Sequence, residues 1–235
     1  RADPKTGAVS SLTVRWHESD FVDTRVGSGL NEYLYVPGKD PSEVQRVTNV
    51  RVRVGEPGPL VASLVIESEA PGCFSLTREL QVTHGIDRLD IIDVINKIPI
   101  RQKEGVHIAF PFRVPDGVVR IDTPWAVVRP ETDQLSGACK NWFTAQRWVD
   151  VSNAESGVTW ATIDAPLVEL GSITAELPWI RTLSPTQTLY SYVMNNYWHT
   201  NYKADQDGPT LFRYSIRPHK AFDEGEAHRF GIGSN

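Results

Sequence analysis

Apolar and polar residues alternate with a period of two along most of this chain. The clearest case is the run around residues 50–54, where Val50, Val52 and Val54 share one side and Arg51 and Arg53 lie on the other. This alternation is typical of a half-buried antiparallel strand, because successive side chains of a strand point to opposite faces. The run therefore predicts a strand with one face toward a core.

Turn-forming residues interrupt the alternation at short intervals, as in Gly55-Glu56-Pro57-Gly58-Pro59 and Pro115-Asp116-Gly117. Residues 87–96 could follow a helical period, since their acids recur every third residue, but their β-branched residues favour a strand. Residues 132–140 predict a surface loop, near which a short helical turn could sit. The expected strands are residues 8–16, 30–38, 50–54, 60–67, 73–83, 87–96, 106–114, 117–122, 146–153, 157–163 and 227–232.

Residues 188–219 predict two further strands joined by a polar turn at residues 205–209. About a dozen short strands, turn signals every 8–12 residues and no sustained helical period indicate an all-β fold. We expect one large antiparallel β-sandwich over residues 1–235, because sandwiches of this length commonly form one domain.

The composition describes an ordinary globular protein, with 40% hydrophobic residues and a formal net charge of −5. Acidic and basic residues are spread evenly, so no basic stripe favours nucleic acid as a partner. No run approaches the roughly 20 apolar residues of a membrane-spanning helix. The chain begins with Arg1 rather than Met, from which we expect a processed or excised piece of a longer protein.

Metal-binding and redox motifs are not evident. The two cysteines, Cys73 and Cys139, are far apart, and buried free thiols are favoured over one long-range disulfide. The six histidines lack the spacing of metal ligands. Residues 205–208 resemble the opening of a calcium loop but lack its later ligands. The sequence therefore predicts no metal ligand and no cofactor within this chain.

Common catalytic motifs are likewise not found, including the phosphate-binding loop and the serine-hydrolase elbow. Glycoside hydrolysis requires two carboxylates about 5–10 Å apart, which the sequence alone does not pair across a sandwich. No catalytic residue is assigned. The acids considered for such a pair, each equally compatible with a solvated turn, are Asp150, Asp164, Glu169, Asp205 and Asp207.

An aromatic and amide-rich segment near residue 198 is the best candidate for ligand contact. Its rings and hydrogen-bonding side chains could stack on and bind a polyhydroxylated ligand, or could fill space between two sheets. His199 could also act as an acid in a mutarotase-like site. The predicted sugar contacts in this segment are Trp198, His199, Asn201 and Tyr202.

Five segments in the same order resemble the carboxy-terminal β-sandwich region of the α-mannosidase family, glycoside hydrolase family 38. They span nearly the whole chain and read DPKTGAVSSL, NEYLYVPG, QRWVDVSN with GVTW, NNYWHTNY and RYSIRPH. The resemblance implies a galactose-mutarotase-like supersandwich that follows a catalytic barrel and a helical region. It also implies that the nucleophile and the zinc ligands belong to those other regions, so zinc is expected there.

The same resemblance suggests one further ligand contact and one departure from the family. Tyr33 matches a tyrosine that lines the rim of the family's sugar pocket, which makes it a predicted mannoside contact. An arginine that follows an aspartate in several members is replaced here in Asp164-Ala165-Pro166. This difference puts the usual mannoside specificity of the parent in question.

Three functions remain open from the sequence. The first is an accessory domain that completes the sugar pocket of an α-mannosidase-like hydrolase and packs on its catalytic domain through an exposed apolar patch. The second is a free-standing carbohydrate-binding module without that patch, and the third is a sugar epimerase that uses His199 and a carboxylate. The first reading is preferred, with the isolated chain expected to be inactive.

Overall fold

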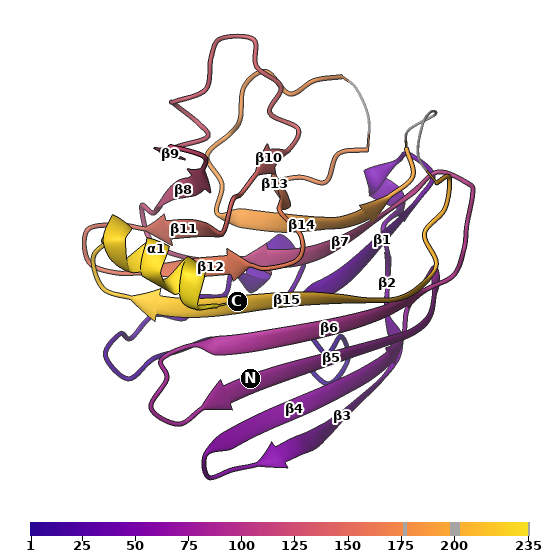
Figure 1. The fold of residues 1–235 in the computed structure, drawn as a ribbon, viewed down its shortest axis with the longest axis horizontal. Coiled ribbons are helices and arrows are strands. Elements are labelled where there is room, and N and C mark those ends of the chain that lie inside the picture. The colour runs from indigo at the N-terminus through magenta and orange to yellow at the C-terminus, as the bar shows by residue number, and fades with distance from the viewer. Residues whose placement is uncertain (176–177, 198–202, 235) are drawn as a thin grey trace.

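The computed structural model describes residues 1–175, 178–197 and 203–234, and two antiparallel β-sheets dominate this part of the chain (Figure 1). The smaller sheet has six strands in the order β10-β13-β14-β7-β1-β2. Its strands are β1 (Glu32–Pro37), β2 (Gln45–Arg46), β7 (Glu104–Pro111), β10 (Phe143–Thr144), β13 (Leu167–Leu170) and β14 (Thr188–Asn195).

The larger sheet has nine strands in the order β3-β4-β5-β6-β15-β12-β11-β8-β9. It begins with four consecutive antiparallel strands, and β15 then joins this half to the remaining strands. The strands are β3 (Thr48–Pro57), β4 (Val61–Glu69), β5 (Cys73–Thr83), β6 (Leu89–Lys97), β8 (Val118–Thr123), β9 (Ala126–Val128), β11 (Trp148–Ser152), β12 (Gly157–Thr162) and β15 (Gly208–His219).

The core between the sheets consists of aliphatic and aromatic side chains from both. Phe110 of the smaller sheet packs against Trp160 and Tyr214 of the larger one, with ring centroids 5.0 and 4.9 Å apart. The Tyr214 hydroxyl also shares a hydrogen bond with Ser191 of β14 across the core. The predicted antiparallel β-sandwich is therefore confirmed, because a shared apolar core joins the two sheets.

Most of the predicted strands are found close to their expected ranges. The ambiguous segment 87–96 forms β6, and residues 146–163 form the antiparallel pair β11–β12. Residues 132–140 lie in turns and coil between strands, as expected of a loop. The predicted free thiols are confirmed, and both are partly exposed rather than fully buried.

Three predictions about local structure are wrong. Residues 227–232 lie in helix α1 (Glu224–Gly233), not in a strand. Residues 8–16 form only isolated bridges, through Val9 and Val14. The turn expected at residues 205–209 extends too far, because β15 already begins at Gly208; the two strands it joins belong to different sheets.

Helix α1 covers the outer face of the larger sheet, where it lies in front of β11 and β12 in Figure 1. The Asp223 carboxylate caps its first turn by accepting a hydrogen bond from the Glu226 N–H at 2.8 Å. Its buried residues include Ala227 and Phe230. Capping and burial of one side explain why this short segment is helical. Two single turns of 3-10 helix occur at Thr24–Val26 and Pro41–Glu43.

The edge strand β3 does not have the half-buried face that its alternation predicts. Val52 and Val54 share a face with Ile66 and Leu64 of β4, yet both valines are exposed. This end of the larger sheet therefore presents apolar side chains that the rest of the described chain leaves uncovered. No helix in residues 1–175, 178–197 and 203–234 is long and apolar enough to cross a membrane.

Candidate functional site

Only one of the five predicted sugar contacts lies in the described part of the chain. Trp198, His199, Asn201 and Tyr202 fall outside the described residues. Tyr33 lies in the core with no exposed surface. Its hydroxyl donates to the Pro71 carbonyl at 2.7 Å, and burial raises the pKa of this phenol well above its usual value. A ligand role for Tyr33 stays a prediction, and in this chain the residue ties β1 to the β4–β5 turn.

A buried polar network surrounds Tyr33 at one end of the sandwich. The Tyr33 hydroxyl also contacts the Cys73 thiol at 3.2 Å, and burial raises the pKa of that thiol. The neighbouring Tyr35 hydroxyl donates to Glu104 at 2.7 Å, and Lys97 forms an ion pair with the same carboxylate at 2.6 Å. Lys97 and Glu104 are almost completely buried, so this pair belongs to the core.

The same network holds the start of the connection between β14 and β15. The Asn196 side chain accepts a hydrogen bond from the Glu104 N–H at 2.6 Å. Its amide donates to the carbonyls of Ile100 and Gln102 at 2.8 and 2.7 Å. Asn196 thus fixes the chain two residues before the segment that contains the predicted sugar contacts.

The stretch that lacks the expected arginine after its aspartate is firmly packed. Asp164 forms a two-point ion pair with Arg213 of β15, with both side-chain distances at 2.9 Å. Ala165 is buried, and its carbonyl accepts the Thr162 hydroxyl at 2.6 Å. Arg213 thus binds Asp164 from a distant strand, a partnership that sequence order does not reveal.

The other acids considered for catalysis have structural partners. Asp205 and Asp207 pair with Arg101 and Lys203. The remaining two carboxylates, of Asp150 and Glu169, are fully buried and bound to neighbouring side chains.

Each of these two buried acids faces a histidine, a pairing that the sequence did not suggest. His219 lies 2.7 Å from Asp150, and His107 lies 2.9 Å from Glu169. His107 and Glu169 have no exposed surface, and the His107 ring stacks on Tyr192 with centroids 4.4 Å apart. Within the described residues no three His, Cys, Asp or Glu side chains cluster as metal ligands would. Asp150 thus hydrogen-bonds across the β11–β12 pair, whereas Glu169 accepts hydrogen bonds from Thr174 beyond the end of β13.

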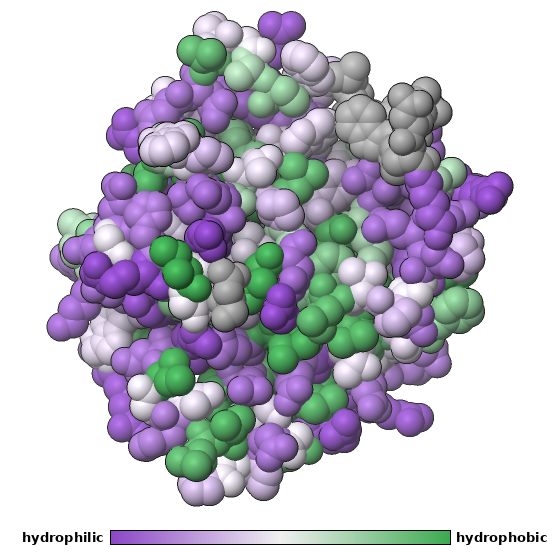
Figure 2. All heavy atoms as spheres, in the orientation of Figure 1, coloured by the Kyte–Doolittle hydropathy of each residue, from purple (hydrophilic) through white to green (hydrophobic). Residues whose placement is uncertain are grey.

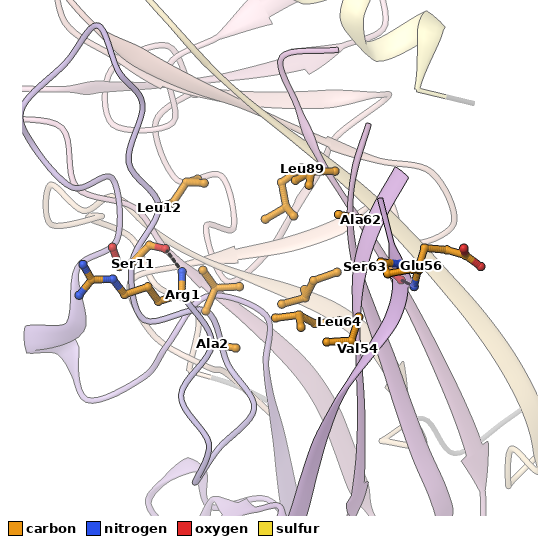
Figure 3. Close-up of a pocket in the computed structure, with 14 residues that line it drawn as sticks. Arg1, Ala2, Ser11, Leu12, Val54, Glu56, Ala62, Ser63, Leu64 and Leu89 are labelled. Carbon is orange, nitrogen blue, oxygen red and sulfur yellow. Dashed lines mark hydrogen bonds between the residues drawn. The ribbon is translucent and has the colours of Figure 1, made fainter. Parts of the chain in front are cut away.

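An apolar groove lies between the N-terminal segment and the inner face of β3–β6 (Figure 3). One wall carries Val54 of β3, Leu64 of β4 and Val82 of β5, and Leu12 faces them from the other wall. Cross-strand pairing places Val54 opposite Leu64, and Leu89 of β6 opposite Val82. The groove has a volume of about 390 Å³.

A second hollow continues the groove past Leu12. It has a volume of about 500 Å³, and Leu12, Val82 and Leu89 line both hollows. Trp16, which is 45% exposed, also lines this hollow, together with polar residues that include Thr13, Arg15 and Asp87. Hydrophobic side chains also reach the surface on the face seen in Figure 2, where polar ones are interspersed among them. Most of the groove lining is apolar, with Arg1, Ser11, Glu56 and Ser63 as its polar residues. A large exposed apolar surface is unusual on a protein without a partner.

Comparison with solved structures identifies several chains that share this fold, among them two from Enterococcus faecalis. An α-mannosidase from Enterococcus faecalis V583 matches with a TM-score of 0.63 and 17% identity, over 90% of this chain and 29% of its own length. A glycosyl hydrolase family 38 protein from Enterococcus faecalis matches with a TM-score of 0.62 and 16% identity, over 90% of this chain and 30% of its own. The chain thus spans less than a third of the length of these two proteins.

A third solved structure matches over most of both chains. The Slr1438 protein from Synechocystis sp. PCC 6803 has a TM-score of 0.50 and 12% identity, and the match covers 92% of this chain and 89% of that protein. No protein-family profile matches the chain, and no curated protein matches it. The resemblance to α-mannosidases is therefore confirmed at the level of the fold: this chain has the β-sandwich fold of one region of glycoside hydrolase family 38 structures.

Proposed function

We propose that this chain is an accessory β-sandwich of an α-mannosidase-like glycoside hydrolase, which packs on a catalytic domain and helps to complete its sugar pocket. The observation that carries the proposal is the match of 90% of this chain to less than a third of two glycoside hydrolase structures. In this proposal the sandwich supports and borders a sugar site that is formed mostly by the rest of the hydrolase.

The apolar groove supports this proposal over a free-standing carbohydrate-binding module. An accessory domain buries a large surface against its neighbour, so the isolated domain exposes contiguous apolar side chains. Val54 is 62% exposed and Val82 is 49% exposed on the groove wall. A sugar-binding face needs many hydrogen-bonding groups to match the sugar hydroxyls, whereas most of the groove lining is aliphatic, with Arg1, Ser11, Glu56 and Ser63 as its polar residues.

The reaction itself is assigned to the rest of the proposed parent enzyme. In this proposal the catalytic domain supplies the nucleophile and binds zinc, and the ligand is a mannoside-like glycan. The test is to assay the isolated chain and the full-length parent on an aryl α-mannoside, with and without a zinc chelator. We expect turnover by the parent alone, lost on chelation, whereas turnover by the isolated chain would contradict the proposal.

A pair of variants in the parent enzyme tests the role of the groove. Val82 lies in the groove on β5, whereas Val94 of the neighbouring strand β6 is 36% exposed and does not line either hollow of the groove. We expect Val82→Asp to lower the melting temperature and the mannosidase activity of the parent, because it buries an unpaired carboxylate at the domain contact. Val94→Asp is the matched control and should change neither quantity appreciably.

The isolated chain supplies a second control for the same variants. Because Val82 is half exposed here, Val82→Asp should change the stability of the isolated chain by less than about 1 kcal/mol. Equal effects of Val82→Asp and Val94→Asp in the parent would show that the groove is not the contact with the catalytic domain.

A further inference from the structure

A second, polar pocket lies beside the N-terminal segment. It has a volume of about 300 Å³. Ala8 and Ser10 of the N-terminal segment line it, whereas Val9 and Ser11 line the apolar groove. The alternating residues 8–11, which predicted a strand, thus line two hollows, and the lining of this pocket is richer in polar residues than that of the groove.

The floor of the polar pocket is a buried carboxylate and guanidinium pair. Glu32 at the start of β1 is 2% exposed and forms an ion pair with Arg46 of β2. The second carboxylate oxygen of Glu32 accepts a hydrogen bond from the Gly29 N–H at 2.7 Å. These contacts fix the guanidinium against the pocket, where the Arg46 side chain remains 40% exposed.

Hydroxyl side chains line the pocket beside Arg46, and the space next to them is open. Ser28 is almost buried, and its hydroxyl lies 3.4–3.5 Å from the Arg46 guanidinium, which is long for a hydrogen bond. Thr24 and Ser10 also line the pocket. Gly27 has no neighbouring atom within 4 Å of the position that a side chain would take, so its surroundings are open. The pocket therefore combines a forked donor with several groups that both donate and accept.

This mixture of groups suits a neutral sugar ring better than other small ligands. A pyranose presents hydroxyls that each donate and accept, which matches serine and threonine hydroxyls together with a guanidinium fork. The carboxylates of Glu32 and Asp3 disfavour a strongly anionic ligand. The volume is at the lower end for small-molecule pockets, which fits one ring rather than an extended glycan.

We propose that the pocket between residues 24–29 and the N-terminal segment binds a single pyranose unit, with Arg46 and Ser28 as its main hydrogen-bonding groups. The site deepens the proposed function, because it would give the sandwich its own sugar contact next to the groove. It requires neither zinc nor the catalytic domain.

The test is a titration of the isolated chain with methyl α-mannopyranoside, followed by the backbone amide signals of Gly27, Ser28 and Gly29 in NMR spectra. We expect saturable shifts with a Kd on the order of 1 mM. Arg46→Lys keeps the charge opposite Glu32 but removes the fork, and should weaken binding about tenfold or more. Ser28→Ala should weaken it severalfold without changing the fold. The matched control is Arg25→Lys, a substitution near the pocket at a residue that pairs with Asp23 and does not line it.

The outcomes separate this site from the proposed function of the whole domain. Absence of shifts with mannoside, glucoside and galactoside, or shifts that persist in both Arg46→Lys and Ser28→Ala, would overturn the site and leave the accessory role intact. Equal shifts with sodium sulfate would replace the sugar by an anion and also overturn it. Sugar binding by a chain whose parent has no mannosidase activity would support the site while contradicting the accessory role.

Discussion

Replacing Glu104 by Gln is expected to lower the free energy of unfolding by about 3–5 kcal/mol, the range for breaking one side of a buried ion pair. Lys97 and Glu104 are 1% and 4% exposed, and their charged atoms lie 2.6 Å apart. The substitution keeps the shape of the side chain and an oxygen that the Tyr35 hydroxyl can donate to. It leaves the Lys97 ammonium buried without a counter-charge, and this accounts for the loss. Urea unfolding of the isolated chain measures this loss in the free energy of unfolding.

Two controls distinguish the buried charge from loss of packing. The double variant Lys97→Met/Glu104→Gln removes both charges and should recover most of the stability, because a neutral pair no longer requires charge compensation. Glu67→Gln breaks the exposed pair with Arg53, whose charged atoms are 3.8 Å apart, and should cost less than about 1 kcal/mol. If the double variant were as unstable as Glu104→Gln, the charge argument would be wrong.

The fold was predictable because each strand can be recognised from the local pattern of its own residues. Alternation with a period of two, bounded by Gly and Pro turns, depends only on which face of a strand is buried, and it located nearly all of the long strands. The sequence analysis missed helix α1 because it assigned residues 227–232 to a strand. Asp223 followed three residues later by Glu226 is an N-terminal capping pattern, and it could have indicated the helix.

The candidate site was less predictable, because a sequence does not say what lies across from a residue. Tyr33 lies in a run of four apolar or aromatic residues in β1, so the sequence does not tell which face is buried, and only the structure shows that its side chain lies in the core. Residues 8–11 do alternate, but they form no strand. Val9 and Ser11 line the apolar groove, whereas Ala8 and Ser10 line the polar pocket. Glu32 and Arg46 are 14 residues apart, and the pairing of β1 with β2 brings them together.

Asp93→Asn is expected to stabilise the chain above neutral pH. Asp93 is completely buried in β6, and burial raises the pKa of its carboxyl to about 7, against the lowering effects of an Asn31 hydrogen bond and the Arg78 charge. The folded state therefore binds a proton more tightly than the unfolded state, in which the pKa is about 3.9. The contribution of this proton is fully present below pH 4 and is lost as the pH rises through 7.

The expected gain follows from that difference in pKa. A pKa difference of about 3 corresponds to about 4 kcal/mol, so the neutral amide should raise the free energy of unfolding by about 2–4 kcal/mol at pH 8 and by little near pH 4. The introduced amide oxygen can still accept the hydrogen bond that the Asn31 side chain gives to Asp93 at 3.0 Å. Urea unfolding of both proteins between pH 4 and 8 measures the effect, and the two stability curves should diverge as the pH rises.

A loss of stability in Asp93→Asn would point to Arg78, whose charge lies next to Asp93. It is also buried, and its guanidinium donates to the carbonyls of Asn31 and Thr6 at 2.9 and 2.8 Å, so backbone oxygens already satisfy part of it. If Asp93→Asn lowered stability at pH 8, the carboxylate would have to be ionised there as the counter-charge of Arg78. Asp90→Asn on the same strand is the control, since Asp90 pairs with Arg88 near the surface and should give no gain. A gain confined to Asp93→Asn, and growing above pH 5, would assign the pH dependence to this buried carboxyl.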